Sequence, residues 1–244
     1  MSKEKISYII LTYNRAEILA EHIVRLKSMH PKELEIIVAD DGSGDSIQIM
    51  CERYLKQGII RKYVNTGNHD KATPSQARNL GIEVATGDLL IFADDDCLPH
   101  YNLIEQFSKL KKGYVGVGYK KSHVSILALF SDDKEEIVKS MEGMAATLYF
   151  QRYLTGNFNA GHFTSGSFAI WREDLGDTRF DEDFVGYGYE DKHFGYLLEK
   201  KGLKFDYMIR AMSYHARETT NRPRSQKDEE AQINKQLLNE KLRK

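Results

Sequence analysis

Residues 88–97, DLLIFADDDC, join an apolar run to three consecutive aspartates. The run LLIFA is typical of a buried strand, and Asp94, Asp95 and Asp96 follow at its end. Two like charges about 4 Å apart repel by about 1 kcal/mol in bulk water, and by several-fold more at a partly buried site. Clustered carboxylates prefer hard divalent metals such as Mn²⁺ or Mg²⁺, which remove that repulsion. A solvated acidic turn is the competing interpretation, but the position at a strand end favours a metal.

Upstream of this stretch, short apolar runs alternate with amphipathic ones. The expected strands are 6–11, 34–39 and 59–64, and the expected helices are 16–29, 46–55 and 75–85. Such alternation predicts an α/β fold with a doubly wound, mostly parallel sheet, which binds ligands beyond the carboxyl ends of its strands. The polar motifs TYN and DDGSGD follow the first two of these strands, and DDD follows the strand expected at LLIFA, the fourth along the chain. We therefore expect one binding site at this edge of the sheet.

The second half of the chain shows weaker patterns. Residues 166–172 (GSFAIWR) read as a strand, and apolar spacing predicts a helix from Glu190 that ends before Gly202. Residues 120–164 are less regular. We expect a single domain over 1–221, with halves 1–119 and 120–221, followed by a charged helical tail over 222–244.

Composition excludes several classes of protein. Lys and Arg number 35 against 36 Asp and Glu, a net charge of −1 that argues against nucleic acid as the main partner. Cys51 and Cys97 have no zinc-type spacing, so a reduced, cytoplasmic chain is expected rather than a disulfide scaffold. No apolar run fits a signal peptide or a membrane span. At most, we expect peripheral contact with the inner face of a membrane.

Two further acidic pairs are candidates for chemistry. Asp40 and Asp41 stand in a glycine-rich turn that lets a nucleotide base or ribose approach, although such composition also makes an ordinary turn. Glu190 and Asp191 open the predicted helix after the glycine-rich VGYGY, where acids are stabilised by the helix dipole. Taken alone this pair reads as capping, and His215 alone reads as a core histidine. Together with DDD they favour catalysis.

The segments ISYIILTYNR (6–15), EIIVADDGSGD (35–45) and ARNLGIEVATGDLLIFADDD (77–96) resemble the nucleotide-sugar half of family 2 glycosyltransferases of the GT-A fold. The resemblance implies that a UDP-sugar is held by Thr12, Tyr13, Asn14, Asp41, Arg78, Asp94 and Asp95, with Asp96 as a ligand of Mn²⁺ or Mg²⁺. The usual pattern of the family is Leu-Asp-x-Asp-Asp, whereas here Ala93 and Cys97 flank the triplet.

The segments TSGSFAIWRED (164–174), FDEDFVGYGYEDKHFGYLLEKKG (180–202) and MSYH (212–215) resemble bacterial chondroitin polymerase domains and the catalytic end of β-1,4-galactosyltransferases. The resemblance covers roughly residues 5–217. It implies Asp191 as catalytic base with Glu190 beside it, and His215 as a second metal ligand. Tyr187 replaces a tryptophan of that pattern, so Tyr187, Gly188 and Trp171 are expected to face the acceptor.

The resemblance implies an inverting, metal-dependent transfer of a hexose or N-acetylhexosamine from a UDP-sugar to a hydroxyl, in surface polysaccharide synthesis. The alternatives are a non-catalytic nucleotide-sugar or carbohydrate-binding module and a peptide glycosyltransferase of the same fold. A nucleotidyltransferase is disfavoured, because TYNRAEIL lacks a glycine-rich phosphate loop. The tail helix is either solvated or a contact for a second copy of the chain or an anionic membrane.

Overall fold

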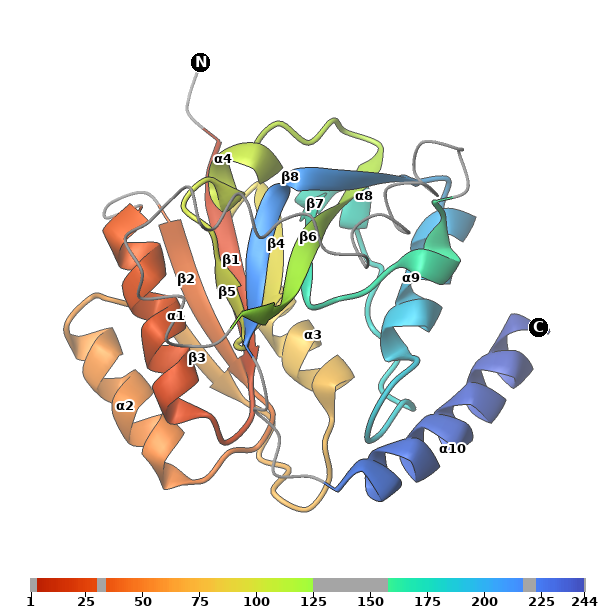
Figure 1. Ribbon diagram of the computed structural model, residues 1–244, viewed down its shortest axis with the longest axis horizontal. Coiled ribbons are helices and arrows are strands. Elements are labelled where there is room, and N and C mark those ends of the chain that lie inside the picture. The colour runs from red at the N-terminus through yellow and green to blue at the C-terminus, as the bar shows by residue number, and fades with distance from the viewer. Residues whose placement is uncertain (1–3, 30–33, 125–157, 217–222, 244) are drawn as a thin grey trace.

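The computed structural model describes residues 4–29, 34–124, 158–216 and 223–243 (Figure 1). Its centre is an eight-stranded sheet with the order β3-β2-β1-β4-β7-β6-β8-β5. The strands are β1 (Ile6–Thr12), β2 (Leu34–Asp40), β3 (Lys62–Asn65), β4 (Leu89–Asp94), β5 (Cys97–Pro99), β6 (Tyr114–Val124), β7 (Ser167–Trp171) and β8 (Lys204–Ala216). The helices are α1 (Ala16–Met29), α2 (Asp45–Lys56), α3 (Pro74–Val84), α4 (Leu103–Phe107), α8 (Arg172–Leu175), α9 (Glu190–Lys200), α10 (Arg224–Leu242) and a short 3₁₀ turn, η1 (Ala160–His162).

Side-chain alternation along the strands builds a core on each face of the sheet. In β1, Ile9 packs with helices α3 and α9, whereas Tyr8 and Ile10 pack with α1, α2 and α4. Successive side chains of a strand point to opposite faces, so a fully apolar strand serves both cores. The layered architecture expected from the alternating pattern is confirmed, and it is that of an α/β protein.

The parallel half of the sheet brings the polar motifs to one edge. Strands β3, β2, β1 and β4 are all parallel, and their registers place Thr12 beside Asp40 and Leu11 beside Asp94. The loops after β1, β2 and β4 therefore leave the sheet at neighbouring points, as expected for motifs that follow parallel strands.

The other half of the sheet is mixed rather than parallel. Strand β7 is antiparallel to β4 and to β6, β6 is parallel to β8, and β5 is antiparallel to β8. Neither β6 nor β8 was expected from the sequence. Close packing favours glycine in β6, because a Cβ at Gly118 would lie 2.9 Å from the backbone oxygen of Ala211.

Helix α10 lies beside the loop that precedes α9 and away from the sheet (Figure 1). The Asn234 side-chain amide donates to the carbonyls of Val185, Tyr187 and Gly188, at 3.0, 3.3 and 3.0 Å. The predicted tail helix thus exists and packs on its own chain. Among the described residues, no helix is long and apolar enough to cross a bilayer.

Candidate active site

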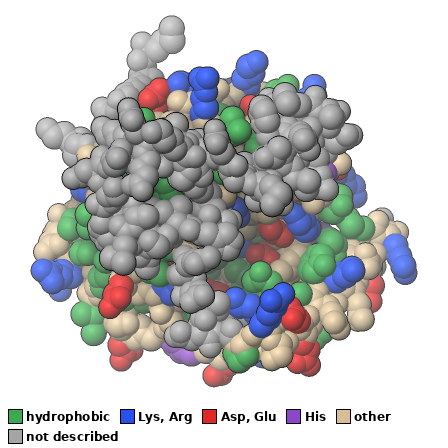
Figure 2. Space-filling model, viewed as in Figure 1, with side chains coloured by type: hydrophobic (Ala, Val, Ile, Leu, Met, Phe, Trp, Pro, Cys, Tyr) green, Lys and Arg blue, Asp and Glu red, His purple; other side chains and the backbone are tan. Residues whose placement is uncertain are grey.

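A cavity of about 750 Å³ opens at the carboxyl edge of the parallel strands. Figure 2 shows acidic and basic side chains close together in the hollowed centre of this face. Its charged lining is contributed by Arg15, Asp41, Arg78, Asp94, Asp96, Lys120, Glu190, Asp191, His215 and Lys227. Loops that are far apart in the sequence thus build one site, and most of the predicted residues are in it.

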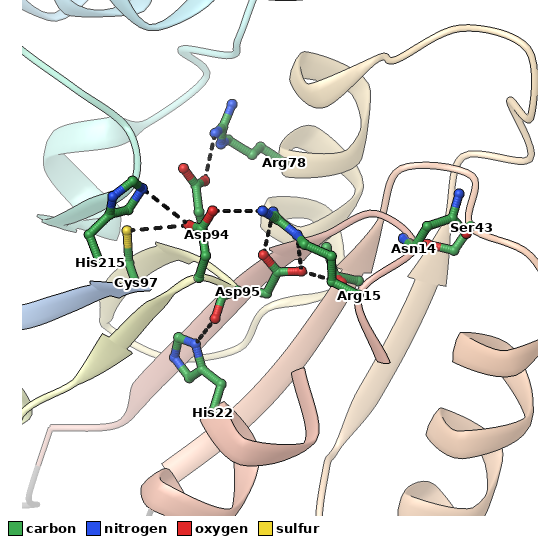
Figure 3. A network of polar contacts seen from close by, with 11 residues as sticks. Asn14, Arg15, His22, Ser43, Arg78, Asp94, Asp95, Cys97 and His215 are labelled. Atoms are coloured by element: carbon green, nitrogen blue, oxygen red, sulfur yellow. Dashed lines mark hydrogen bonds and ion pairs between the residues drawn. The ribbon is translucent and has the colours of Figure 1, made fainter. Parts of the chain in front are cut away.

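Arg15 neutralises two of the three aspartates of the triplet (Figure 3). Its guanidinium pairs with both carboxylate oxygens of the buried Asp95 and lies 2.6 Å from Asp96 Oδ2. Thr12 adds a hydroxyl that donates to Asp95 Oδ2 at 2.7 Å. Burial raises the pKa of the Asp95 carboxyl to about 7, against the opposing effect of Arg15. Asp95 and Thr12 therefore organise the loop from within, and neither lines the cavity.

A buried histidine of α1, His22, holds the backbone of the triplet by a hydrogen bond. His22 Nδ1 lies 2.9 Å from the carbonyl oxygen of Asp95, and Tyr8 Oη lies 3.1 Å from His22 Nε2. Burial lowers the pKa of His22 to about 4, so the ring is neutral at physiological pH. A neutral ring has one N–H, which donates to the carbonyl while the other nitrogen accepts from the tyrosine hydroxyl. This chain of contacts fixes Asp95 in place.

Arg78 connects the two halves of the site. Its guanidinium, buried on α3, lies 3.0 Å from Asp94 Oδ1 and 3.2 Å from Glu190 Oε1. The two carboxylates come from strand β4 and from the start of helix α9, 96 residues later. One arginine thus positions Asp94, the first residue of the aspartate triplet, against the Glu190–Asp191 pair.

The acidic pair stands in the first turn of α9, as predicted. Tyr189 precedes it in the left-handed conformation, with φ of 70°, which turns the chain sharply into the helix. Burial raises the pKa of both Glu190 and Asp191 above their ordinary values, although Arg78 opposes this for each carboxyl. Asp191 Oδ1 accepts from the backbone N–H of Lys192 at 2.7 Å. The arrangement supplies a desolvated carboxylate facing the cavity.

Asp96 and His215 meet as the resemblance implied. Asp96 Oδ1 lies 3.7 Å from His215 Nε2, where the start of β5 pairs with β8. A carboxylate oxygen and an imidazole nitrogen are ordinary ligands for Mn²⁺, and both residues line the cavity. Their donor set therefore fits a divalent ion.

The loop after β2 is held by hydrogen bonds between its own residues and neighbouring segments. Both carboxylate oxygens of Asp41 accept from the backbone N–H of Thr73, at 2.8 and 2.9 Å, and the Thr73 hydroxyl donates to one of them at 2.7 Å. Asn14 Oδ1 accepts from the backbone of Gly44 at 2.9 Å, which ties the first loop to the second. Asp41, Asn14 and Tyr13 line the cavity, where burial raises the pKa of Asp41 to about 6.

Tyr187 and Gly188 lie on the far wall of the cavity, and α10 supports them. Tyr187 is half exposed, and the ammonium of Lys227 lies 5.1 Å from the centre of its ring. Lys227 itself lines the cavity, so the tail contributes to the site. This role of the tail was not predicted, because nothing in its sequence pattern links it to residues 185–188.

Trp171 is not brought to the cavity. Because β7 runs antiparallel to β4, Trp171 pairs with Leu89 at the opposite end of the sheet. Its indole N–H donates to the carbonyl of Leu110 at 2.9 Å, and the ring is buried in the core.

Arg15 was not predicted as a site residue, although its position directly after TYN, where the triplet requires a counter-charge, was a usable signal.

The family profile described as "Glycosyl transferase family 2" matches residues 7–178. AmsB of Erwinia amylovora, an amylovoran biosynthesis glycosyltransferase, is 26% identical over 217 residues, which are 86% of this chain and 69% of that one. Chondroitin synthase of Escherichia coli is 25% identical over 266 residues, covering 97% of this chain and 38% of the relative. This chain therefore spans well under half of that relative.

Solved structures share the fold. A mannosyltransferase of Pyrobaculum calidifontis, in complex with GDP-Man and Mn²⁺, matches with a TM-score of 0.63 at 16% identity, over 91% of this chain and 59% of its own. TarS of Staphylococcus aureus, residues 1–349, in complex with UDP-GlcNAc, gives a TM-score of 0.63 at 15% identity, over 89% of this chain and 60% of its own.

The fold and the site define a glycosyltransferase of the GT-A class. Within that class, the chain belongs to glycosyltransferase family 2. The resemblance to chondroitin polymerases is confirmed by the relatives, and related chains act in polysaccharide biosynthesis.

Proposed function

We propose that the protein transfers a hexose or N-acetylhexosamine from a UDP-sugar to a hydroxyl of a saccharide acceptor, with inversion at the anomeric carbon and with a divalent metal. One observation carries the proposal. Arg78 joins Asp94 of the triplet to Glu190 of the acidic pair, so the groups for donor and acceptor share one cavity.

The donor is assigned to the edge of the parallel strands. Tyr13, Asn14 and Asp41 line the cavity beside the strand ends, where the nucleoside is expected. Arg15 and Lys120 add positive charge to the same lining, which suits a diphosphate. The TarS complex with UDP-GlcNAc supports a UDP-sugar, and the mannosyltransferase complex shows that this fold also takes GDP-sugars.

Asp191 is assigned the role of base. The acceptor hydroxyl becomes acidic as its oxygen attacks the anomeric carbon, and the Asp191 carboxylate takes the proton. The bond from that carbon to the diphosphate oxygen breaks, and its electron pair leaves with the nucleotide. Burial raises the pKa of Asp191, which makes its carboxylate a stronger base than an exposed aspartate. Glu190, paired with Arg78, orients the acceptor beside Tyr187.

Asp96 and His215 are the residues that would hold Mn²⁺ or Mg²⁺. When bound, such an ion supplies electrostatic stabilisation of the negative charge on the departing diphosphate. Arg15, with its Nη1 2.6 Å from Asp96 Oδ2, holds that carboxylate in place at the cavity.

A non-catalytic carbohydrate-binding module is the second candidate. It would need the cavity but no buried base, and the retention of Asp191 in a desolvated position favours an enzyme.

The test is turnover of UDP-sugars with Mn²⁺, first as slow hydrolysis and then with saccharide acceptors. Asp191→Asn should lower turnover by about 10²- to 10⁴-fold while UDP-sugar binding, measured by calorimetry, is unchanged. The exposed Asp177 provides the matched control, since Asp177→Asn removes an equal charge outside the cavity and should leave turnover unchanged. Full turnover in Asp191→Asn would overturn the assignment, and product NMR coupling constants would show whether the anomeric carbon is inverted.

A further inference from the structure

A buried thiol stands beside the proposed metal ligands and has no role in the transfer. Cys97 follows Asp96 directly and lies on β5, where its Cα pairs with that of His215 on β8 (Figure 3). Residues paired across antiparallel strands project their side chains to the same face of the sheet. The thiol therefore points to the same side as the imidazole.

The three side chains form a compact donor set. Cys97 Sγ lies 3.7 Å from Asp96 Oδ1, and His215 Nε2 lies 3.7 Å from the same oxygen. One ligand atom from each of the three residues lies within 4.8 Å of the others. Groups at these separations can reach a single ion with small side-chain adjustments. It is the one such group of three among the described residues.

The chemistry of this set differs from that needed for the transfer. A carboxylate and an imidazole suit Mn²⁺, whereas a thiolate selects Zn²⁺ and other thiophilic ions. Three protein ligands of the types Asp, Cys and His are sufficient for Zn²⁺, with a fourth position left open.

We propose that Asp96, Cys97 and His215 form a three-ligand site for a thiophilic divalent cation such as Zn²⁺, with Cys97 as the ligand that distinguishes it from Mn²⁺. The inference rests on the proposed function in one respect, since Asp96 and His215 are shared with the ion that supports transfer. Zn²⁺ takes the thiol as a thiolate, and the thiol proton passes to water. The two ions therefore compete, and Zn²⁺ leaves fewer open positions for a diphosphate.

The experiment uses Co²⁺ as a spectroscopic substitute for Zn²⁺, added to the full chain without nucleotide. A Co²⁺–thiolate bond gives a charge-transfer absorption band that carboxylate and imidazole ligands do not give. The wild-type protein should show this band, Zn²⁺ should abolish it by displacement, and Cys97→Ser should not show it. Calorimetry should find that Cys97→Ser weakens Zn²⁺ binding by more than about 10-fold. Loss of a residue that only hydrogen-bonds to a metal ligand already lowers metal affinity about 10- to 100-fold, and Cys97 is a ligand itself.

Cys51 provides the matched control, because it is the other cysteine of the chain and is also buried. It lies on α2 within the hydrophobic core, so Cys51→Ser should retain the band and the Zn²⁺ affinity. Cys97→Ala repeats the test with an apolar residue, and circular dichroism establishes that each variant is folded.

The outcomes separate the inference from the proposed function. If Mn²⁺ supports transfer in wild type and Cys97→Ser alike, but both bind Zn²⁺ equally and neither shows the band, the three-ligand site is refuted and the proposed function stands. If transfer persists in EDTA, the metal dependence of the proposed function is refuted instead. A band that survives in Cys97→Ser would also overturn the inference.

Discussion

Removal of Arg78 should destabilise the protein in a way that depends on pH. Its guanidinium is buried and contacts Asp94 Oδ1 at 3.0 Å and Glu190 Oε1 at 3.2 Å. In Arg78→Met, both carboxylates lose their partner inside the protein. Breaking one partner of a buried ion pair typically costs about 3–5 kcal/mol. For a chain of this size, that corresponds to a fall in Tm of about 6–20 °C near neutral pH.

The pH dependence follows from Glu190. Burial raises the pKa of Glu190, so its ionised form weakens the fold, and this loss grows as the pH rises from the ordinary value of a glutamate through the folded one. Arg78 limits the loss in the wild type, and without it the folded pKa of Glu190 rises further. The difference in unfolding free energy between wild type and Arg78→Met should therefore be largest near pH 8. Near pH 5 the carboxyl is protonated in the variant, and the cost should fall to that of lost hydrogen bonds, about 1–3 kcal/mol.

The assay is urea unfolding followed by circular dichroism at several pH values between 5 and 8. Arg172 gives a matched control, because its guanidinium donates to the carbonyl of Gly87 at 2.7 Å and has no carboxylate partner in the described structure. Arg172→Met should cost a similar free energy at each pH. An equal cost for Arg78→Met at pH 5 and pH 8 would refute the argument that Arg78 acts by holding Glu190 ionised.

Three further predictions concern single contacts. Gly42→Ala should abolish UDP binding and lower Tm, because the added Cβ would lie 2.0 Å from the backbone oxygen of Asn68 at a φ of 82°; calorimetry and thermal unfolding check this. Asn234→Ala should cost about 1–3 kcal/mol of local stability and raise KM for the acceptor, and unchanged hydrogen exchange in α10 would contradict it. Thr12→Val leaves the buried Asp95 one hydrogen bond short and should cost about 1–2 kcal/mol in urea unfolding, whereas Thr12→Ser should restore most of it.

The parallel half of the fold was predictable because its signals are local. The helix expected over 16–29 has these bounds in the structure, and α2 and α3 each differ by one residue at each end. Apolar runs in strands that are buried on both faces are recognisable without their partners.

The mixed half was not predictable, because its strands depend on distant neighbours. Strand β6 carries glycines at 116 and 118, which a strand pattern disfavours, and they are explained by the packing of Met208 and Ala211 from β8. The direction of β7 relative to β4 placed Trp171 far from the site, and no local pattern in residues 166–172 reports direction.

The candidate site likewise contains residues that were predicted from the sequence and residues that were not. Asp96 and His215 were paired through resemblance, and their distance of 3.7 Å agrees with a shared ion. Arg15 was overlooked because counter-charges are identified in space, and the contribution of Lys227 depends on how a distant helix folds back. The metal-binding roles of Asp96 and His215 stay predictions. Residues 125–157, for which no role was predicted, lie outside the described residues.

The three hydrogen bonds from Asn234 to the loop before α9 are relevant to protein engineering. Two amide hydrogens are shared among three carbonyls, so the shape of one cavity wall is encoded 46 to 49 positions further along the chain. Mutant libraries that aim to change the acceptor should therefore include Asn234 and its neighbours on α10, where substitutions reshape the wall without replacing Glu190 or Asp191. An Asn234→Asp substitution would set a carboxylate against the same three carbonyls and turn the attraction that holds this wall into repulsion.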